Sequence, residues 1–307
     1  MEERHAYLII AHNEPELLKI LLRLIDDDRN DIYLHIDKKA NMKNDIEFLE
    51  VVKKSKIKIY REYNIKWGHQ SQVKCEIFLI KEANKRDYRY FHIISGSDLP
   101  IKTQDEIHEF FKANDGYEFI HYDKRRIDEK EFSRVNYYHF LSRFFKISKF
   151  KAINKMIFIL DNLLVSIQKL IGIKRIKDIN LIKKGCNWCS ITNELAKYIL
   201  LKNDEIEKLT SFTKCADEIF IQTVVEKSAF KYKLFNNNYD NNYISCCRLI
   251  EWNSENKNRP YIFRSKDYER IIESSYIFVR KFSMKIDSDI VYKICDFIRS
   301  KEAKKCS

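Results

Sequence analysis

The first 122 residues alternate between short apolar runs and segments with helical periodicity, and this alternation restricts the possible fold more than any other feature. AYLIIAH (residues 6–12) and DIYLHID (31–37) have the length and composition of buried strands. Asn13 as a cap and Pro15 in the first turn predict a helix after the first strand. Strands that alternate with helices at this spacing predict an α/β fold with a mainly parallel sheet. The predicted strands are residues 6–12, 31–37, 56–62, 88–95 and 117–122, and the predicted helices among them are residues 13–23, 70–83 and 103–113.

Polar side chains follow three of these strands. His12 and Asn13 follow the first, Asp37 ends the second, and the sequence SGSD, with Asp98 as its acid, follows the fourth. In open α/β sheets, ligands bind beyond the carboxyl ends of the strands. An ordinary turn or cap explains any one of the three, but the three together predict a nucleotide-type cleft at this edge.

Residues 124–184 form a basic and aromatic segment with a largely helical pattern. Apolar and basic residues interleave there, as in a helix that lies on an anionic membrane surface. An amphipathic helix packed on the protein core has the same pattern, so both interpretations stay open. Further on, the sequence predicts a strand and turn in 185–195, a helix over 217–226 and a terminal helix. No linker interrupts the chain, so we expect one domain over 1–307, in which segment 124–184 separates 1–123 from 185–307.

The chain is basic, with 57 Lys and Arg against 45 Asp and Glu, a net charge of +12. Such a charge favours anionic partners, which include nucleic acid, acidic lipid and phosphorylated substrates. The five glycines form neither GxGxxG nor a P-loop. Cys186 and Cys189 have CxxC spacing but lack a second pair of ligands, which favours buried thiols over zinc. The N-terminal residues predict no signal peptide, no run reaches the roughly 18 apolar residues of a membrane span, and we therefore expect a cytoplasmic protein.

An ordered set of motifs gives this sequence a resemblance to a known family. AYLIIAHN, YLHIDKKA, KWGHQSQV, ISGSDLPIKT, GCNWCSIT, CADEIFIQTVV, RLIEW and FVRKF occur in the order found in the core-2/I-branching glycosyltransferases, over about residues 6–289. The resemblance implies a GT-A fold with a Rossmann-like sheet, a helical insertion, and inverting transfer from a UDP-sugar. It also implies that no divalent metal is needed. SGSD supplies one acid where a metal-binding DxD would lie, and the DxD of Asp287 and Asp289 is better explained as a helix cap.

The resemblance also assigns the chemical roles. An inverting transfer needs a general base for the acceptor hydroxyl and a group that neutralises the departing diphosphate. Glu218 matches the catalytic base of the family, and Asp217 is expected to cap or orient the helix beside the acceptor. The alternative is that both are first-turn acids favoured by the helix dipole. Lys281, Arg280 and Arg259 match diphosphate-binding positions, where fixed cations would replace a metal.

Other positions match the two ends of the substrate site. Asp37 and Asp98 match the nucleotide cleft, where we expect one of them to contact the uridine with His12 and Asn13 close by. Trp188 lies in the acceptor-side motif, where its ring would stack on a sugar, and core packing is the alternative. The filling of that motif, CNWC, departs from the family on the acceptor side.

The expected partners follow from the same resemblance. The donor would be a UDP-sugar, with UDP-GlcNAc as the first candidate, and the acceptor a glycan or a lipid-linked saccharide. The composition suggests a bacterial member of the family, and a lipid-linked acceptor would explain a peripheral contact of residues 143–180 with an anionic membrane. Two alternatives are a glycan-binding member without activity and a nucleic-acid-binding protein. No nucleic-acid-binding signature is present, so we expect no nucleic-acid partner.

Overall fold

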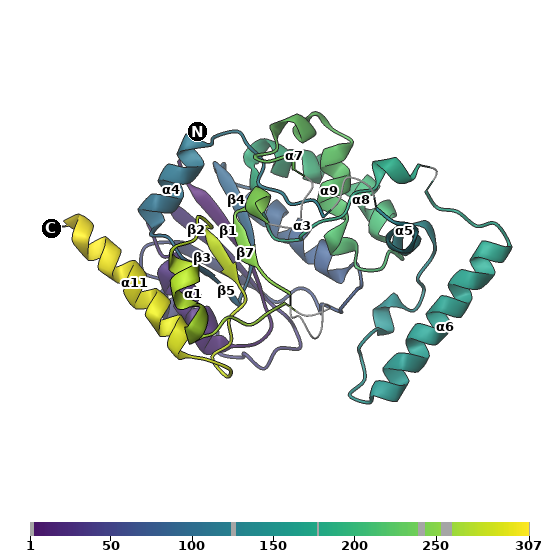
Figure 1. Cartoon of the computed structure of the whole chain (residues 1–307), viewed down its shortest axis with the longest axis horizontal. Helices are drawn as coiled ribbons and strands as arrows, with labels where there is room; N and C mark the ends of the chain where they lie inside the picture. The colour runs from purple at the N-terminus through teal and green to yellow at the C-terminus, as the bar shows by residue number, and fades with distance from the viewer. Residues whose placement is uncertain (1–2, 124–126, 177, 239–242, 253–259, 307) are drawn as a thin grey trace.

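The alternation of strands and helices builds a five-stranded sheet with the strand order β3-β2-β1-β4-β6. The computed structural model describes residues 3–123, 127–176, 178–238, 243–252 and 260–306 (Figure 1). Four strands are parallel, and β6 runs antiparallel to β4. This is the predicted α/β fold with a mainly parallel sheet, in the GT-A-like arrangement that the resemblance implied. The strands are β1 (His5–Ala11), β2 (Asn30–Ile36), β3 (Lys56–Tyr60), β4 (Tyr90–Ser95) and β6 (Cys189–Thr192).

Helices bury both faces of this sheet (Figure 1). Along β1, Tyr7 and Ile9 belong to one hydrophobic cluster, whereas Leu8 and Ile10 belong to the other. A strand that is buried on both faces reads as a continuous apolar run, which is why the sequence pattern identified it. The first cluster contains α1 (Pro15–Leu24), α4 (Gln104–Ala113) and α11 (Asp289–Cys306), and the second contains α3 (Ser71–Ala83), α7 (Asn193–Leu201) and α9 (Phe220–Glu226).

A second, smaller sheet brings the last third of the chain to the end of β4. It has the order β5-β8-β7, with β5 (Asp98–Pro100) antiparallel to β8 (Phe278–Arg280) and β7 (Arg248–Ile250) parallel to β8. Asp98 of β5 is the register partner of Arg280. This pairing places cations from the C-terminal part of the chain at the strand ends of the N-terminal part.

The remaining helices are short, apart from α6 at one end of the molecule (Figure 1). None of the helices in the described ranges is both long and apolar enough to cross a membrane. The α-helices are α2 (Ile46–Val51), α5 (Glu129–Asn136), α6 (Lys151–Leu170), α8 (Asn203–Thr210) and α10 (Tyr268–Ile272). The 3-10 helices are η1 (Ser142–Phe144), η2 (Ile179–Leu181), η3 (Ala216–Glu218), η4 (Ala229–Lys233), η5 (Ile244–Cys246) and η6 (Ser265–Asp267).

Three local predictions were wrong. Residues 117–122 form no strand: only isolated bridges pair Glu118 with Leu234 and Phe119 with Ser190, and the apolar pattern reflects burial without a ladder. The N-cap of α1 is Glu14 instead of Asn13. The predicted helix over 217–226 is divided into η3 and α9, because Ile219 has a non-helical backbone between them.

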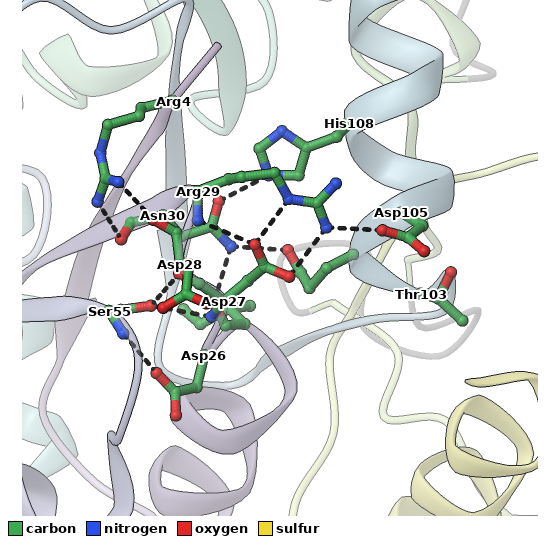
Figure 2. A network of polar contacts seen from close by, with 12 residues as sticks. Arg4, Asp26, Asp27, Asp28, Arg29, Asn30, Ser55, Thr103, Asp105 and His108 are labelled. Carbon is green, nitrogen blue, oxygen red and sulfur yellow. Dashed lines mark hydrogen bonds and ion pairs between the residues drawn. The ribbon is translucent and has the colours of Figure 1, made fainter. Parts of the chain in front are cut away.

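A polar network fixes the turn before β2, at the opposite end of the strands from the predicted cleft (Figure 2). Arg29 donates to both oxygens of Asp27 at 2.7 and 2.9 Å and to Asp105 at 2.7 Å. Asn30 donates to the Ile25 carbonyl at 2.8 Å and accepts a hydrogen bond from His108, with 2.9 Å between the atoms. These contacts hold the start of β2 against α4, so the network has a structural role.

Candidate active site

The three polar strand ends lie at one edge of the sheet, as the sequence predicted. Ala11 pairs with Ile36 across β1 and β2, and Ile10 pairs with Ser95 across β1 and β4. The Gly96 N–H donates to the Ile10 carbonyl at 3.0 Å. A Cβ on Gly96 would lie 2.8 Å from the Ala11 Cβ, so a side chain there would force the two strand ends apart. The residues after β1, β2 and β4 are therefore neighbours in space.

Asp37 organises the loop beyond β2. Its side chain is buried, and its carboxylate accepts the N–H of Lys39 at 2.8 Å and of Ile65 at 3.1 Å. The Asp37 N–H in turn donates to the Ala11 carbonyl at 2.9 Å. Asp37 thus ties three loops together at the predicted nucleotide side.

His12 lies within the electrostatic reach of several predicted site residues. Burial lowers the pKa of His12, the negative charge of Asp37 opposes this shift, and the positive charges of Lys281 and Arg280 reinforce it. Part of the His12 side chain is exposed. Asn13 follows it as an exposed residue. The structure thus brings His12, Asp37, Arg280 and Lys281 into one neighbourhood.

Asp98, Arg280 and Trp188 form one stack. Asp98 is 2% exposed and accepts hydrogen bonds from the Ser95 N–H at 2.9 Å and the Ser95 hydroxyl at 2.7 Å. Arg280 donates to the same carboxylate at 2.7 Å, and its guanidinium carbon lies 4.6 Å from the Trp188 ring centroid. The three residues were predicted for nucleotide, diphosphate and acceptor respectively, and the structure places them in direct contact.

The other two predicted cations have different outcomes. Lys281 follows β8, is partly exposed, and accepts a backbone hydrogen bond from Phe263 at 3.1 Å. Arg259 lies outside the described residues. Asp287, the first acid of the downstream DxD, caps a helix as the sequence predicted. Its carboxylate accepts a hydrogen bond from the Ile290 N–H, in the first turn of α11, at 3.1 Å.

Glu218 lies on the other side of the candidate site, between two cations. Its Oε2 accepts a hydrogen bond from Arg134 of α5 at 3.0 Å and lies 3.9 Å from Lys184 Nζ. One third of the Glu218 side chain is exposed, so the carboxylate is held and yet reachable from solvent. Sequence reasoning missed Arg134 and Lys184, because no motif marks them among 57 basic residues.

Two more carboxyl groups lie on this side of the site: Asp217, which precedes Glu218, and Glu76, which is within electrostatic reach of Asp217. Burial and the negative charge of Glu218 raise the pKa of Asp217 to about 7, against the opposing charge of Arg134. Glu76 of α3 is buried, and its Oε1 accepts a hydrogen bond from Asn187 at 2.8 Å. Burial raises the pKa of Glu76 well above its usual range, and the charge of Asp217 adds to this. No sequence motif pointed to Glu76.

Residues 185–188 join the acidic side of the site to the cationic side. The Gly185 N–H donates to the Glu218 carbonyl at 2.9 Å. Asn187 donates a hydrogen bond to the buried Glu76 carboxyl of α3, and the guanidinium of Arg280 packs against the Trp188 ring. The predicted acceptor-side motif therefore physically links the proposed base to the proposed leaving-group cations.

The cysteines of this motif do not build a metal centre. Cys186 and Cys189 are free thiols, and Cys189 is completely buried. Among the described residues, no group of three or more His, Cys, Asp or Glu side chains could hold a metal ion. Cys189 is the buried thiol that the sequence predicted, whereas Cys186 is only half-buried.

Comparisons with known proteins agree with the motifs. Xylosyltransferase 2 of the mouse, Mus musculus, is 23% identical over 314 residues, which cover 96% of this chain and 33% of the mouse protein. The rat and dog xylosyltransferases 2 are each 22% identical over the same shares. The chain thus spans about one third of the length of these relatives. Residues 5–273 match the family described as Core-2/I-Branching enzyme, a range that includes Glu218 and ends before Arg280 and Lys281. Because this match covers most of the sequence, the chain belongs to the Core-2/I-Branching enzyme family.

Proposed function

We propose that this chain is an inverting glycosyltransferase, a single catalytic domain that moves a sugar from a UDP-sugar to an acceptor hydroxyl without a divalent metal. One observation carries the proposal: a solvent-accessible carboxylate, Glu218, is fixed by Arg134 at 3.0 Å on one side of residues 185–188. On the other side of the same segment lie Arg280 and Lys281. A base and fixed cations are the two groups that such a displacement requires.

The base acts in a single displacement. The acceptor oxygen forms a bond to the anomeric carbon while the bond from that carbon to the UDP oxygen breaks. The hydroxyl proton goes to Glu218, and UDP leaves with the electron pair of the broken bond. Because Arg134 binds Oε2, Oε1 is the atom that takes the proton. Arg134 and Lys184 orient the carboxylate, and Asp217 lies beside the acceptor.

Fixed cations would receive the diphosphate. Lys281 supplies a charge beside His12, and Arg280 is oriented by Asp98 and Trp188. The single acid of SGSD already has a guanidinium on its carboxylate, which supports a reaction without a metal. In this proposal Asp98 acts on the nucleotide through Arg280, whereas Asp37, His12 and Asn13 line the uridine side.

The sugar and the acceptor are finer proposals. UDP-GlcNAc is the first donor candidate, and UDP-xylose is the second because the similar mouse, rat and dog proteins carry the name xylosyltransferase. The acceptor would be a glycan or a lipid-linked saccharide, in polysaccharide or glycolipid assembly on the cytoplasmic side of a bacterial membrane.

The decisive experiment compares Glu218→Gln with Glu226→Gln. Glu226 also forms an ion pair, with 3.7 Å between its carboxylate and Lys183 Nζ. It lies outside the proposed site and is therefore the matched control. We expect Glu218→Gln to lose about 100-fold or more in transfer, as for a general base, while UDP binds with unchanged affinity. Turnover within a few-fold of the unchanged protein would refute the assignment of the base.

A calorimetric panel tests the donor and the metal. UDP, UDP-sugars, GDP and CMP would be titrated with EDTA and again with manganese. Selective UDP binding that ignores EDTA supports the metal-free site, and a requirement for manganese contradicts it. If UDP and all UDP-sugars fail to bind, the glycan-binding and nucleic-acid-binding alternatives take precedence.

A further inference from the structure

Helix α6 meets the protein through a mixed face that includes buried polar side chains, instead of the apolar stripe expected of a surface helix. Two polar side chains face the body beside the buried Val165 and the half-buried Phe158, and the first of them, Asp161, is 1% exposed and contacts His139 at 2.6 Å. Gln168 is 5% exposed and exchanges hydrogen bonds with the backbone of Tyr138 at 2.8 and 3.0 Å. A surface helix normally turns its apolar stripe toward the core. Here buried polar contacts fix which face of α6 meets the protein.

A second face of α6 is apolar and points to solvent. Six side chains that are between 41% and 86% exposed recur at spacings of three and four residues, which places them in one stripe. They are Ile153, Met156, Leu160, Leu163, Ile167 and Leu170. Phe150 and Ile171, 72% and 66% exposed, extend the stripe beyond both ends. A helix of 20 residues is about 30 Å long, so the stripe is a large apolar surface.

The residues around this stripe are basic. Between residues 143 and 175 the sequence has eight Lys and Arg and one acid, Asp161, which is buried against His139. At the helical angle of about 100° per residue, Lys151, Lys155 and Lys169 lie along one flank of the stripe. The basic residues are Arg143, Lys146, Lys149, Lys151, Lys155, Lys169, Lys174 and Arg175.

We propose that residues 143–175, the docking segment, bind the surface of an anionic lipid bilayer. The apolar stripe enters the interface between headgroups and acyl chains, and the lysines bind the acidic headgroups. An exposed apolar face with a basic flank is the combination that interfacial helices use, and each basic residue near such a surface adds to binding. The helix lies in the plane of the membrane and does not cross it.

A second copy of the chain fits this surface less well. The spacing of three and four residues also suits helix pairing, in which charged flanks of opposite sign select the partner. A second docking segment would bring another eight basic residues, and its one acid is buried against its own His139. Like charges would therefore face one another, whereas an anionic bilayer neutralises them.

The docking segment is connected to the proposed base. Phe158 of α6 lies 4.7 Å from Lys214 Nζ, and Lys214 is four residues before Glu218. Arg134, which holds Glu218, lies just before the docking segment in sequence. Bound in this way, α6 sets the acidic side of the site near the membrane, where a lipid-linked acceptor would be found. This last step rests on the proposed function, but membrane binding itself does not.

Co-sedimentation of the full chain with vesicles tests the surface. We expect binding to vesicles of phosphatidylcholine mixed with phosphatidylglycerol, weaker binding at higher salt, and little binding to phosphatidylcholine alone. Leu160→Glu with Leu163→Glu should abolish binding, whereas the control Leu201→Glu, at a residue of α7 that is 78% exposed, should leave it unchanged. Replacing Lys151, Lys155 and Lys169 by Gln should weaken binding about fivefold for each lysine removed. Replacing Lys53, Lys54 and Lys56 by Gln is the charge-matched control.

Three results would overturn the proposal. One is equal vesicle binding by the α6 variants and their controls, or equal binding to neutral and anionic vesicles. Another is a large fall in melting temperature on Leu163→Glu, which would place the stripe against the protein body. The last is a protein that self-associates in sedimentation velocity but does not bind vesicles. If Leu163→Glu abolishes this self-association, the stripe belongs to an interface with a second copy. Vesicle binding without any turnover would refute the proposed function and leave the docking surface intact.

Discussion

Replacing Asp217 by Asn should stabilise the protein at alkaline pH and have little effect in acid. Burial and the charge of Glu218 raise the pKa of Asp217 from 3.8 to about 7. Below about pH 4, the carboxyl group is neutral in both the folded and the unfolded chain. As the pH rises from 4 to 7, the unfolded chain loses this proton and the folded chain keeps it. The folded state therefore loses stability progressively and bears the full cost above pH 7.

The shift sets the size of the effect. Three pKa units at 1.36 kcal/mol each give an upper value of about 4 kcal/mol. Asp217 is partly exposed, so solvent screening reduces this to about 2 kcal/mol. For a chain of this size, that corresponds to a rise in melting temperature of roughly 3 °C. Asn keeps the shape of the side chain but cannot ionise, so the substitution removes the free-energy cost of holding Asp217 in the folded state at alkaline pH.

The assay is the melting temperature of both proteins from pH 4.5 to 8.5, taken as the difference at each pH. Titrations that the two proteins share cancel in this difference. The same substitution in a Glu218→Gln background should stabilise less, because one source of the raised pKa is gone. A difference that does not change with pH, or that grows toward acid, would refute the argument. An increase in stability joined to a loss of transfer would identify Asp217 as a group kept for function.

Three further perturbations address other parts of the molecule. Burial raises the pKa of Asp27, but the hydrogen bonds and charge of Arg29 outweigh burial and lower this pKa to about 2. Asp27 therefore contributes stability to the folded state above pH 3.8, and this contribution is lost as the pH falls through 2. Asp27→Asn should therefore cost about 2 kcal/mol in urea unfolding at pH 7, and an unchanged midpoint would contradict the ion pair. Gly185→Ala should lower the melting temperature and the yield of folded protein, because its Cβ would lie 1.8 Å from the His121 carbonyl oxygen. Lys281→Ala should weaken calorimetric binding of UDP much more than that of uridine, and equal losses would remove it from the diphosphate site.

The sequence predicted the central strands well because their physical signal is local. β1, β2 and β4 are buried on both faces, so their residues form continuous apolar runs that need no tertiary information. The segment 117–122 carries the same signal, and Phe119 and Ile120 are indeed fully buried. Their backbone meets β6 at one bridge only, so burial alone did not specify a ladder.

The contacts that define the site were less predictable because they join distant parts of the chain. Glu218 and Arg134 are 84 residues apart, and neither spacing nor composition selects this arginine among so many basic residues. Motif resemblance located Glu218 but was silent on the group that orients it. The buried carboxyl of Glu76 lies in a helix whose sequence pattern indicates only which face is apolar.

Helix α6 shows a second limit of the sequence pattern. Periodicity identified an amphipathic helix, but periodicity is unchanged when the helix is rotated by half a turn about its axis. A helix packed on the core and a helix lying on a membrane therefore have the same sequence pattern. They differ in which face of the helix is turned toward the protein. The hydrogen bonds of Asp161 and Gln168 identify the face that meets the body, and the apolar stripe left exposed is the basis of the membrane proposal.

The stack of Asp98, Arg280 and Trp188 bears on how a diphosphate could leave without a metal. A carboxylate that coordinates a metal must direct its oxygens at the ion, whereas Asp98 directs one oxygen at Arg280 and the other at the Ser95 N–H. The cation in this arrangement is part of strand β8, held by register with β5 and by the indole ring. Because Asp98 largely balances the charge of Arg280, we propose that attraction of a diphosphate falls mainly on Lys281. In the proposed reaction Arg280 would orient the diphosphate, because its N–H groups are already positioned by Asp98 and Trp188 in the folded chain and need no ordering in each catalytic cycle.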